Sequence, residues 1–416
     1  MNNRSRYIQV FEHESIQTYP RSDGRYLTPK QLDQLCAFND KHGHKYFNVI
    51  RQGVKFKQYV GVIQVGRTTI EILPKTDNNN PQLWHNILLQ MLAECKKIKR
   101  ESVSQAVLRK RENSLLDLYI EMYLDEVEVL LHKGLSKKYL QEQSQTKALK
   151  GKLLFSKHIR KNIVHKERFF TEHTIYSSDN TFNKIIKTGL KVIAKLNCAS
   201  YMKDRALGLL IYFHNVSDAG IINDKSFDRL NLSRNTEKYK EAISIARLII
   251  LNYSPDIRSG SENLLAILFD MNNLWEDFIY RQLLKSREAD VEVLPQRKKK
   301  FWENKEIKPD IVIKKGEETF IIDTKWKVLD QIEPSDADLK QMFTYNIHWE
   351  SAHSILIYPR TPDSPKNTFG KYHKGMEEGH GCTLAFIEIL NDQGKLKRDG
   401  LTDFWRLMDK KEDKTI

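Results

Sequence analysis

The segment Phe320-Ile321-Ile322-Asp323-Thr324-Lys325 places a carboxylate directly after three apolar residues. A continuous apolar run of this kind predicts a strand in the interior of a sheet, where an uncompensated charge is costly. Because side chains alternate along a strand, Asp323 and Lys325 are expected on one face, and Ile322 and Thr324 on the other. The chain must therefore fold so that the strand is buried and its acidic residue has a partner.

A second carboxylate stands at the start of the preceding apolar run, in Lys308-Pro309-Asp310-Ile311-Val312-Ile313. The pattern predicts two strands, Ile311 to Lys314 and Thr319 to Trp326, joined by the turn Lys315-Gly316-Glu317. A hairpin register then brings Asp310 beside Asp323. A surface edge strand, in which Asp323 and Lys325 form an ordinary ion pair, is the competing interpretation.

Two carboxylates held close together repel each other, and burial raises that cost, so a divalent cation between them is the expected stabiliser. Mg²⁺ suits such oxygen ligands, and Mn²⁺ is the alternative ion. A bound ion polarises a phosphoryl oxygen and lowers the pKa of a bound water, while Lys325 orients that water or stabilises developing negative charge. Asp310, Asp323 and Lys325 therefore suit phosphodiester hydrolysis.

Two neighbouring helices are expected to add residues to this site. The first, over about Leu264 to Leu284, contains Glu276, which turns inward as a further metal ligand or holds a metal-bound water, or else remains a surface acid. The second, over about Asp336 to Trp349, carries Gln341 and Tyr345 four residues apart. These two side chains share one helix face and are candidates for fixing the substrate or the lysine.

The predicted order after residue 256 is that of one compact α/β unit. Its other strands are Val291 to Leu294, Ser354 to Tyr358 and Thr383 to Leu390. Just before the first carboxylate, the basic run Arg297-Lys298-Lys299-Lys300 is followed by Phe301-Trp302. This run is either a grip on phosphate near the scissile bond or a solvated loop.

The first 80 residues are predicted to form a β-rich domain. The expected strands are Tyr7 to Phe11, Phe47 to Ile50, Tyr59 to Val65 and Thr68 to Ile72, and Gly66-Arg67 forms the turn of a hairpin between the last two. Proline and the run Asp77-Asn78-Asn79-Asn80 then end the β pattern.

Residues 81–255 are predicted to be mainly helical, with helical periodicity from Gln82, from Leu115 to Leu131 and from Thr181 to Leu196. The basic stretch from Lys137 to Arg168 is either a nucleic-acid face or a solvated surface. Turn-forming residues at Asn252 to Asp256 and at Ser259-Gly260-Ser261 mark the boundary to the last domain, residues 256–416.

The overall charge favours a polyanionic partner, because 68 basic residues stand against 54 acidic ones, with a formal net charge of +14. The four cysteines lie far apart and match neither a disulfide framework nor a zinc site. No stretch is apolar enough for a membrane span, so a cytoplasmic location is expected. No GxxxxGK[ST] phosphate loop occurs, so a nucleotide-driven motor would have to be another subunit.

These motifs resemble a known superfamily. Pro309-Asp310 with Asp323-Thr324-Lys325 is similar to the PD-(D/E)xK motif of restriction-endonuclease-like nucleases, and Gln341 with Tyr345 is similar to the QxxxY element of some branches. More narrowly, the chain resembles the McrC family, the nuclease subunits of McrBC modification-dependent restriction systems. Gly61 to Lys75 resembles that family's N-terminal strand pair, and Lys150-Gly151-Lys152-Leu153 with Ser178 to Asn183 resembles its middle segment.

The resemblance implies a Mg²⁺-dependent endodeoxyribonuclease of a phage-defence restriction system that acts on DNA containing modified cytosine. It also implies a partner, McrB, a hexameric AAA+ GTPase that recognises and translocates modified DNA. In that family the N-terminal part of the nuclease subunit inserts into the ring and stimulates hydrolysis, so Ile72 to Lys75 would belong to the partner-facing half. Two alternatives stay open: a stand-alone repair or defence nuclease, and a non-catalytic DNA-binding regulator of an NTPase.

Overall fold

The computed structural model describes residues 6–20, 23–74, 81–99, 114–255, 263–327, 333–360, 364–373, 379–391, 396–397 and 401–409. Contacts divide the chain into unit 1, which combines Met1–Ile63, Thr68–Leu115 and Leu268–Ile416, and unit 2, which combines Gln64–Arg67 and Leu116–Ile267. The first and last predicted domains thus share a unit, while their boundaries at residues 80 and 255 stay a prediction. The turns predicted at Asp77 to Asn80 and at Ser259 to Ser261 lie outside the described residues.

The N-terminal part of unit 1 is β-rich, as predicted. Strand β1 (Arg6–Phe11) pairs in parallel with β6 (Thr68–Leu73), and β5 (Tyr59–Val65) belongs to the same sheet. The predicted turn at Gly66-Arg67 is confirmed, since Gly66 has a positive φ of 57° that glycine adopts without strain. A separate small sheet has the order β2 (Ser15–Gln17), β4 (Gly53–Phe56), β3 (Phe47–Ile50).

Two helices accompany these strands. Helix α1 (Pro29–Lys41) begins at a capping box in which Thr28 and Gln31 each bond the other's backbone. Helix α2 (Pro81–Glu94) packs against β6 and buries apolar residues that include Ile87 and Leu88.

The helix predicted over Leu264 to Leu284 is wrong in its first third. Residues Leu264–Asp270 form strand β11, and helix α10 (Met271–Ser286) begins only after Asp270, whose side chain accepts hydrogen bonds from the first-turn backbone N–H groups. The segment Leu264 to Phe269 is continuously apolar, and such a run fits a buried strand as well as a buried helix. Glu276 keeps its predicted helical position.

The C-terminal part of unit 1 contains a sheet whose strand order, in the described part of the chain, is β12-β15-β16-β17-β19-β18. Antiparallel pairing links β12 (Val291–Pro295) to β15 (Ile311–Lys315) and β15 to β16 (Glu318–Thr324), whereas β17 (His353–Arg360) is parallel to β16 and to β19 (Gly381–Glu388). Strand β18 (Thr368–Lys371) forms one edge of this sheet and β12 the other. Helix α12 (Thr402–Asp409) follows the sheet along the chain. The strands predicted for this region are confirmed within a few residues.

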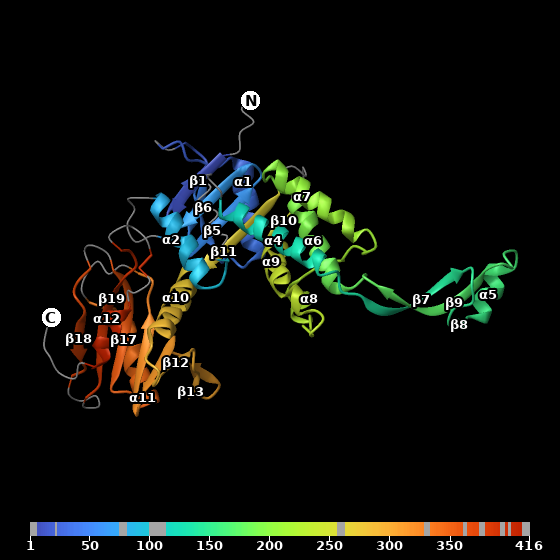
Figure 1. The fold of residues 1–416 in the computed structure, drawn as a ribbon. Helices are drawn as coiled ribbons and strands as arrows, with labels where there is room; N and C mark the ends of the chain where they lie inside the picture. The colour runs from blue at the N-terminus through green and yellow to red at the C-terminus, as the bar shows by residue number, and fades with distance from the viewer. Residues whose placement is uncertain are drawn as a thin grey trace. The chain divides into compact units, whose positions relative to one another are not determined.

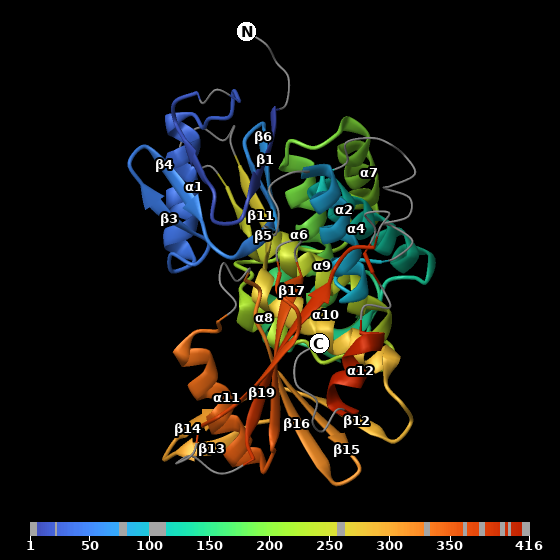
Figure 2. The ribbon, with the colours of Figure 1, turned by 90° about the vertical axis from the view of Figure 1, so that its left-hand side faces the viewer.

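Helix α11 (Asp336–Trp349) has the bounds predicted from sequence, and Ser335 caps its first turn. It buries Met342, Tyr345 and Trp349 against one face of the sheet, where Val312, Ile321 and Leu356 complete a common apolar core. Figure 2 shows α11 lying beside these strands. Residue 321 and residue 323 share a face of β16, so Asp323 points toward α11.

Unit 2 contains two of the predicted helices, α4 (Leu115–His132) and α6 (Thr181–Lys195). It also contains α7 (Ser200–Leu210) and α9 (Lys240–Leu251), with shorter elements η1 (Ile211–Phe213), α8 (Asp224–Asp228) and η2 (Glu237–Tyr239). Strand β10 (Tyr253–Ser254) pairs antiparallel with the start of β11.

The mainly helical interpretation of the middle region missed a long antiparallel sheet. Strand β7 (Lys138–Thr146) pairs along its whole length with β9 (Phe169–Ser177), and β8 (Lys152–Leu153) and α5 (Phe155–Asn162) complete this part. Figure 1 shows β7 and β9 running out from the helices of unit 2, with α5 at their far end. The basic stretch from Lys137 to Arg168 therefore runs through β7, β8, α5 and the turns between them.

None of the helices in the described ranges combines the length and the apolar character needed to cross a membrane.

Candidate active site

The register of the β15–β16 hairpin determines how the two aspartates approach each other. Ile311 pairs with Ile322 at the last position of the ladder, so one further step along each strand sets Asp310 opposite Asp323. Directly opposed residues of an antiparallel pair project to the same face. The hairpin thus directs both carboxylates to one side of the sheet, as the sequence predicts.

Asp310 is held by the residue that follows Asp323. Its Oδ2 accepts hydrogen bonds from the backbone N–H of Thr324 at 2.7 Å and from the Thr324 hydroxyl at 2.9 Å. Thr324 was expected on the face opposite Asp323, and its backbone N–H and hydroxyl nevertheless both reach the Asp310 carboxylate at the end of β16. Burial raises the pKa of Asp310 above its usual range, although the two bonds from Thr324 act in the opposite direction.

Asp323 and Lys325 form the ion pair expected of two residues on one strand face. Oδ2 of Asp323 lies 2.6 Å from Nζ of Lys325, and the aspartate is only 3% exposed. Burial and then the charge of Asp310 raise the pKa of Asp323 to about 6, although Lys325 lowers it. For Lys325, burial acts to lower the pKa, but the surrounding carboxylates outweigh it, and the pKa is raised.

Helix α11 supplies the two further polar residues predicted from the i, i+4 spacing. Gln341 Nε2 donates to Tyr345 Oη at 2.8 Å and to Asp323 Oδ1 at 3.3 Å, and its Oε1 accepts from Lys325 Nζ at 3.2 Å. The Tyr345 hydroxyl in turn donates to the backbone oxygen of Lys308 at 3.0 Å. One amide therefore links the lysine, the aspartate and the tyrosine of the predicted motif.

Asp338 is a residue of this site that the sequence interpretation missed. It lies in the first turn of α11, is buried, and has Oδ1 3.5 Å from Lys325 Nζ and Oδ2 2.6 Å from Lys327 Nζ. Burial alone would raise its pKa, but the bonds from Lys327 and Ser335 and the nearby charges lower it. The only sequence signal that could have assigned Asp338 to the site is its position three residues before Gln341, on the same helix face.

Glu276 on α10 faces the carboxylates of the hairpin. Burial, followed by the charges of Asp310 and Asp323, raises the pKa of Glu276 to about 7. Its Oε1 accepts a hydrogen bond from Gln296 Nε2 at 2.6 Å, and the backbone N–H of Gln296 donates to the carbonyl oxygen of Asp310 at 2.8 Å. The structure thus brings all six predicted site residues into one neighbourhood, and their roles stay predictions.

The donor set suits a hard cation held by few protein ligands. The described residues contain no group of three or more His, Cys, Asp and Glu side chains arranged to hold a metal ion. Mg²⁺, however, keeps several waters and uses one or two carboxylates. Asp310 and Asp323 are two buried carboxylates with raised pKa values, and a cation would relieve that cost.

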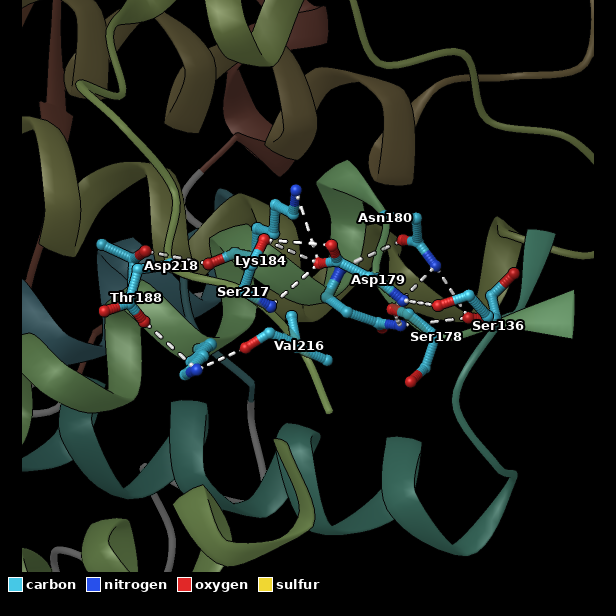
Figure 3. Close-up of polar contacts among 12 residues, drawn as sticks. Ser136, Ser178, Asp179, Asn180, Lys184, Thr188, Val216, Ser217 and Asp218 are labelled. Carbon is cyan, nitrogen blue, oxygen red and sulfur yellow. Dashed lines mark hydrogen bonds and ion pairs between the residues drawn. The ribbon is translucent and has the colours of Figure 1, made fainter. Parts of the chain in front are cut away.

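The middle motif Ser178 to Asn183 has a structural role in unit 2. The Asp179 carboxylate accepts bonds from the backbone N–H of Ser217 at 2.9 Å and from its hydroxyl at 3.0 Å, while Asn180 caps α6 and donates to the Ser136 carbonyl at 2.8 Å (Figure 3). Gly151 of the other middle motif has a positive φ, and a Cβ there would lie 2.4 Å from the carbonyl oxygen of Glu172. Both motifs therefore shape the fold of unit 2.

The N-terminal motif is largely internal. Ile72 and Leu73 are buried in β6, so these two side chains are not available to a partner, and Lys75 lies outside the described residues. Glu71 of the same strand is also buried and accepts a bond from Gln9 at 2.9 Å and pairs with His85 at 2.8 Å. The partner-facing role of the first 80 residues stays a prediction that other residues would have to fulfil.

Comparison with known proteins places this geometry in context. The family model of the McrBC 5-methylcytosine restriction system component matches residues 54–359. A curated relative from Escherichia coli (strain K12), the type IV methyl-directed restriction enzyme EcoKMcrBC, is 24% identical over 262 residues, which cover 59% of this chain and 70% of the relative.

Two solved structures have a similar fold. A chain from the Thermococcus gammatolerans assembly of McrB AAA+ hexamers with bound McrC superposes with a TM-score of 0.73 at 19% identity and covers 97% of this chain and 99% of that chain. A chain from the cryo-EM structure of the McrBC complex of the same organism gives a TM-score of 0.52 at 19% identity over 67% of this chain and 88% of that chain. Nearly the whole length of this chain thus has a counterpart of the same fold.

Proposed function

The chain belongs to the McrBC 5-methylcytosine restriction system component family, and on this basis we propose that it is the DNA-cleaving subunit of such a system. The observation that carries the proposal is the convergence of Asp310, Asp323 and Lys325 at the ends of two adjacent strands, with 2.6 Å between Asp323 and Lys325. This arrangement, with α10 before it and α11 after it, supports a PD-(D/E)xK nuclease domain.

Asp310 and Asp323 would hold Mg²⁺, or Mn²⁺ in its place, and Glu276 would add a third carboxylate to the site. When bound, the cation polarises a phosphoryl oxygen and makes a water molecule more acidic. The three carboxylates supply hard oxygen donors, and burial disfavours their charged forms unless a cation is near.

The chain's own residues have separable tasks in hydrolysis. Lys325 places a positive charge beside Asp323, where it stabilises the negative charge that develops on the phosphate. Gln341 fixes the direction of that ammonium group through its Oε1 and is itself oriented by Tyr345. Without a cation nearby, burial and the charges of Asp310 and Asp323 raise the pKa of Glu276 to about 7, so its carboxyl can hold a proton near neutral pH.

We further propose that cleavage depends on an AAA+ GTPase hexamer, which this chain binds and stimulates, and that the substrate is DNA with modified cytosine. The structural relative comes from an assembly of McrB AAA+ hexamers with bound McrC, and the curated relative is methyl-directed. This chain contains no GxxxxGK[ST] loop with which to bind the nucleotide itself.

The test combines the purified full-length chain with its AAA+ partner, GTP, Mg²⁺, and methylated or unmodified DNA. We expect cleavage of the methylated DNA by the complete mixture, and loss of cleavage with Asp323→Ala while GTP hydrolysis by the partner is still stimulated. Asp290→Ala, which removes an exposed carboxylate just before β12, is the matched control and should cut normally.

The alternatives give different results in the same assay. Strong cleavage by the chain without partner or GTP would identify a stand-alone nuclease. Unchanged cleavage with Asp323→Ala would assign the cutting to another protein and leave this chain a DNA-binding regulator.

A further inference from the structure

A short hairpin is joined at both ends to residues of the candidate active site. It consists of β13 (Lys299–Trp302) and β14 (Lys305–Ile307) and is inserted between β12 and β15. Gln296, which precedes the hairpin, bonds Glu276 and the Asp310 carbonyl oxygen. Lys308 follows the hairpin, and its carbonyl oxygen accepts a hydrogen bond from Tyr345. Both ends of the hairpin are thus fixed to residues of the proposed cutting site.

One face of the hairpin is docked on α11. Lys299 Nζ donates to the carbonyl oxygen of His348 at 2.6 Å and lies 5.1 Å from the centre of the Trp349 ring. The Phe301 ring packs edge-on against His348, with 5.5 Å between ring centres. These contacts hold the hairpin against the nuclease sheet's own helix and give it a fixed direction.

The rest of the hairpin is exposed, basic and aromatic. Lys300 is exposed and the Trp302 side chain is 62% exposed, while a β-bulge between these two residues interrupts the alternation of the strand. Between residues 297 and 307 five basic residues stand against two acidic ones. A large exposed indole is costly to leave in water, and its combination with cations is typical of surfaces that meet phosphates and bases.

The length of the hairpin limits where it can reach. From Gln296 to Trp302 a strand extends at most about 20 Å, at ~3.3 Å per residue. One strand of B-DNA carries a phosphate every ~3.4 Å, so this reach corresponds to about six nucleotides.

We propose that the exposed part of this hairpin, centred on Lys300 and Trp302, contacts the cut DNA within about six nucleotides of the scissile phosphate. Lys300 neutralises a backbone phosphate, and Trp302 packs on a base or sugar. The inference rests on the nuclease function proposed above and assigns the DNA-facing surface of that site.

The experiment is a position-specific crosslink. Trp302→Cys carries a photoactivatable group in the full-length chain assembled with its AAA+ partner, and the end-labelled methylated DNA is illuminated in EDTA so that it stays intact. We expect crosslinks within about six nucleotides of the cut site mapped separately with the unsubstituted chain and Mg²⁺. Lys314→Cys, on an exposed position of β15, is the matched control and should give none there.

A kinetic measurement accompanies the crosslink. Lys300→Gln with Trp302→Ala should raise the DNA concentration for half-maximal cleavage at least about ten-fold and reduce its salt dependence, without changing GTPase stimulation. Lys314→Gln should leave all three quantities unchanged.

Each other outcome overturns the proposal. Crosslinks to the partner protein alone, or lost GTPase stimulation in the double variant, would make the hairpin a protein-docking surface. Crosslinks to neither, with unchanged cleavage, would make it a solvated loop. Failure of the nuclease function is seen separately, because Asp323→Ala would then still cut while the Trp302→Cys crosslink to DNA remained.

Discussion

Nζ of Lys325 and Oδ2 of Asp323 are 2.6 Å apart, so the lysine occupies the neighbourhood of an oxygen that is also proposed to coordinate a cation. The ammonium group and a divalent cation would therefore compete for the same carboxylate. Asp338 provides Lys325 with a second anionic neighbour at 3.5 Å, which would remain its partner if Asp323 held the proposed cation.

Replacing Lys325 should reduce cleavage without weakening metal binding. Lys325→Gln removes the competing positive charge, so calorimetric titration should show Mn²⁺ binding that is as tight as in the unsubstituted protein or tighter. Cleavage by the assembled complex should fall by ~10²–10³-fold, because the stabilising charge is lost. Lys314→Gln, at an exposed position of β15, is the control and should change neither quantity. Loss of metal binding together with cleavage would show that Lys325 only maintains the shape of the site.

Asp338 should prove to be a positioning residue. Asp338→Asn leaves Lys325 without its second carboxylate, and we expect a ~10- to 100-fold lower rate at saturating DNA, with little change in DNA affinity. The conservative Asp338→Glu should restore part of the rate. Asp336→Asn removes an exposed acid from the same helical turn and should cut normally. Equal loss of activity in the two asparagine variants would point to a general effect on the helix N-terminus.

The stability of the metal-free protein should decrease as the pH rises. The pKa of Glu276 is raised from 4.5 to about 7, so between these values the folded state binds the proton more tightly than the unfolded state. The stabilisation from this group is complete below pH 4.5 and is lost as the pH rises through about 7. Chemical denaturation of Glu276→Gln in EDTA should show a weaker decrease over this range than the unsubstituted protein. Identical pH profiles would place the Glu276 carboxyl in water.

Asn183 should be essential for the stability of unit 2. This fully buried side chain donates to the carbonyl oxygens of Ser136 and Ser178 at 3.0 and 2.6 Å and accepts from the Tyr239 hydroxyl at 2.6 Å. Asn183→Ala removes three hydrogen bonds from this buried network and takes away the acceptor of the Tyr239 hydroxyl, so we expect a loss of about 3 kcal/mol in unfolding free energy. Circular dichroism during thermal unfolding measures it, with the exposed Asn235→Ala as control. A melting temperature equal to that of the control would contradict the structural role of this motif.

The hairpin with the two aspartates could be predicted because its signals agree at each level. Apolar runs define β15 and β16, and Gly316 between them has the positive φ of 59° that a tight turn requires. The i, i+4 spacing likewise placed Gln341 and Tyr345 on one face of α11.

The errors have two physical causes. The run Leu264 to Phe269 is apolar at every position, so it has no period from which a strand could be distinguished from a helix. Strand β7 presents the opposite difficulty, because nearly all its residues are exposed and polar on both faces, so no alternation of apolar residues marks it. Its partner β9 lies 23 or more residues away along the chain, at Phe169 and beyond.

The site residues that were not predicted from the sequence are brought together by tertiary contacts. Gln296 reaches Glu276 across 20 positions of the chain, and Asp338 meets Lys325 only because α11 packs on the β16 face. The contact of Thr324 with Asp310 likewise joins two strands, since Thr324 ends β16 and Asp310 precedes β15. Sequence spacing within one element cannot report such contacts.

The insertion of unit 2 between segments of unit 1 has a consequence for biosynthesis. Unit 2 is complete once Leu116–Ile267 has left the ribosome, so it can begin to fold early. Unit 1 cannot be completed until Leu268 and later residues have been synthesised. Every proposed cutting residue lies in that late segment. A polypeptide whose translation stops before Leu268 thus lacks every one of these residues as well as the segment that completes unit 1.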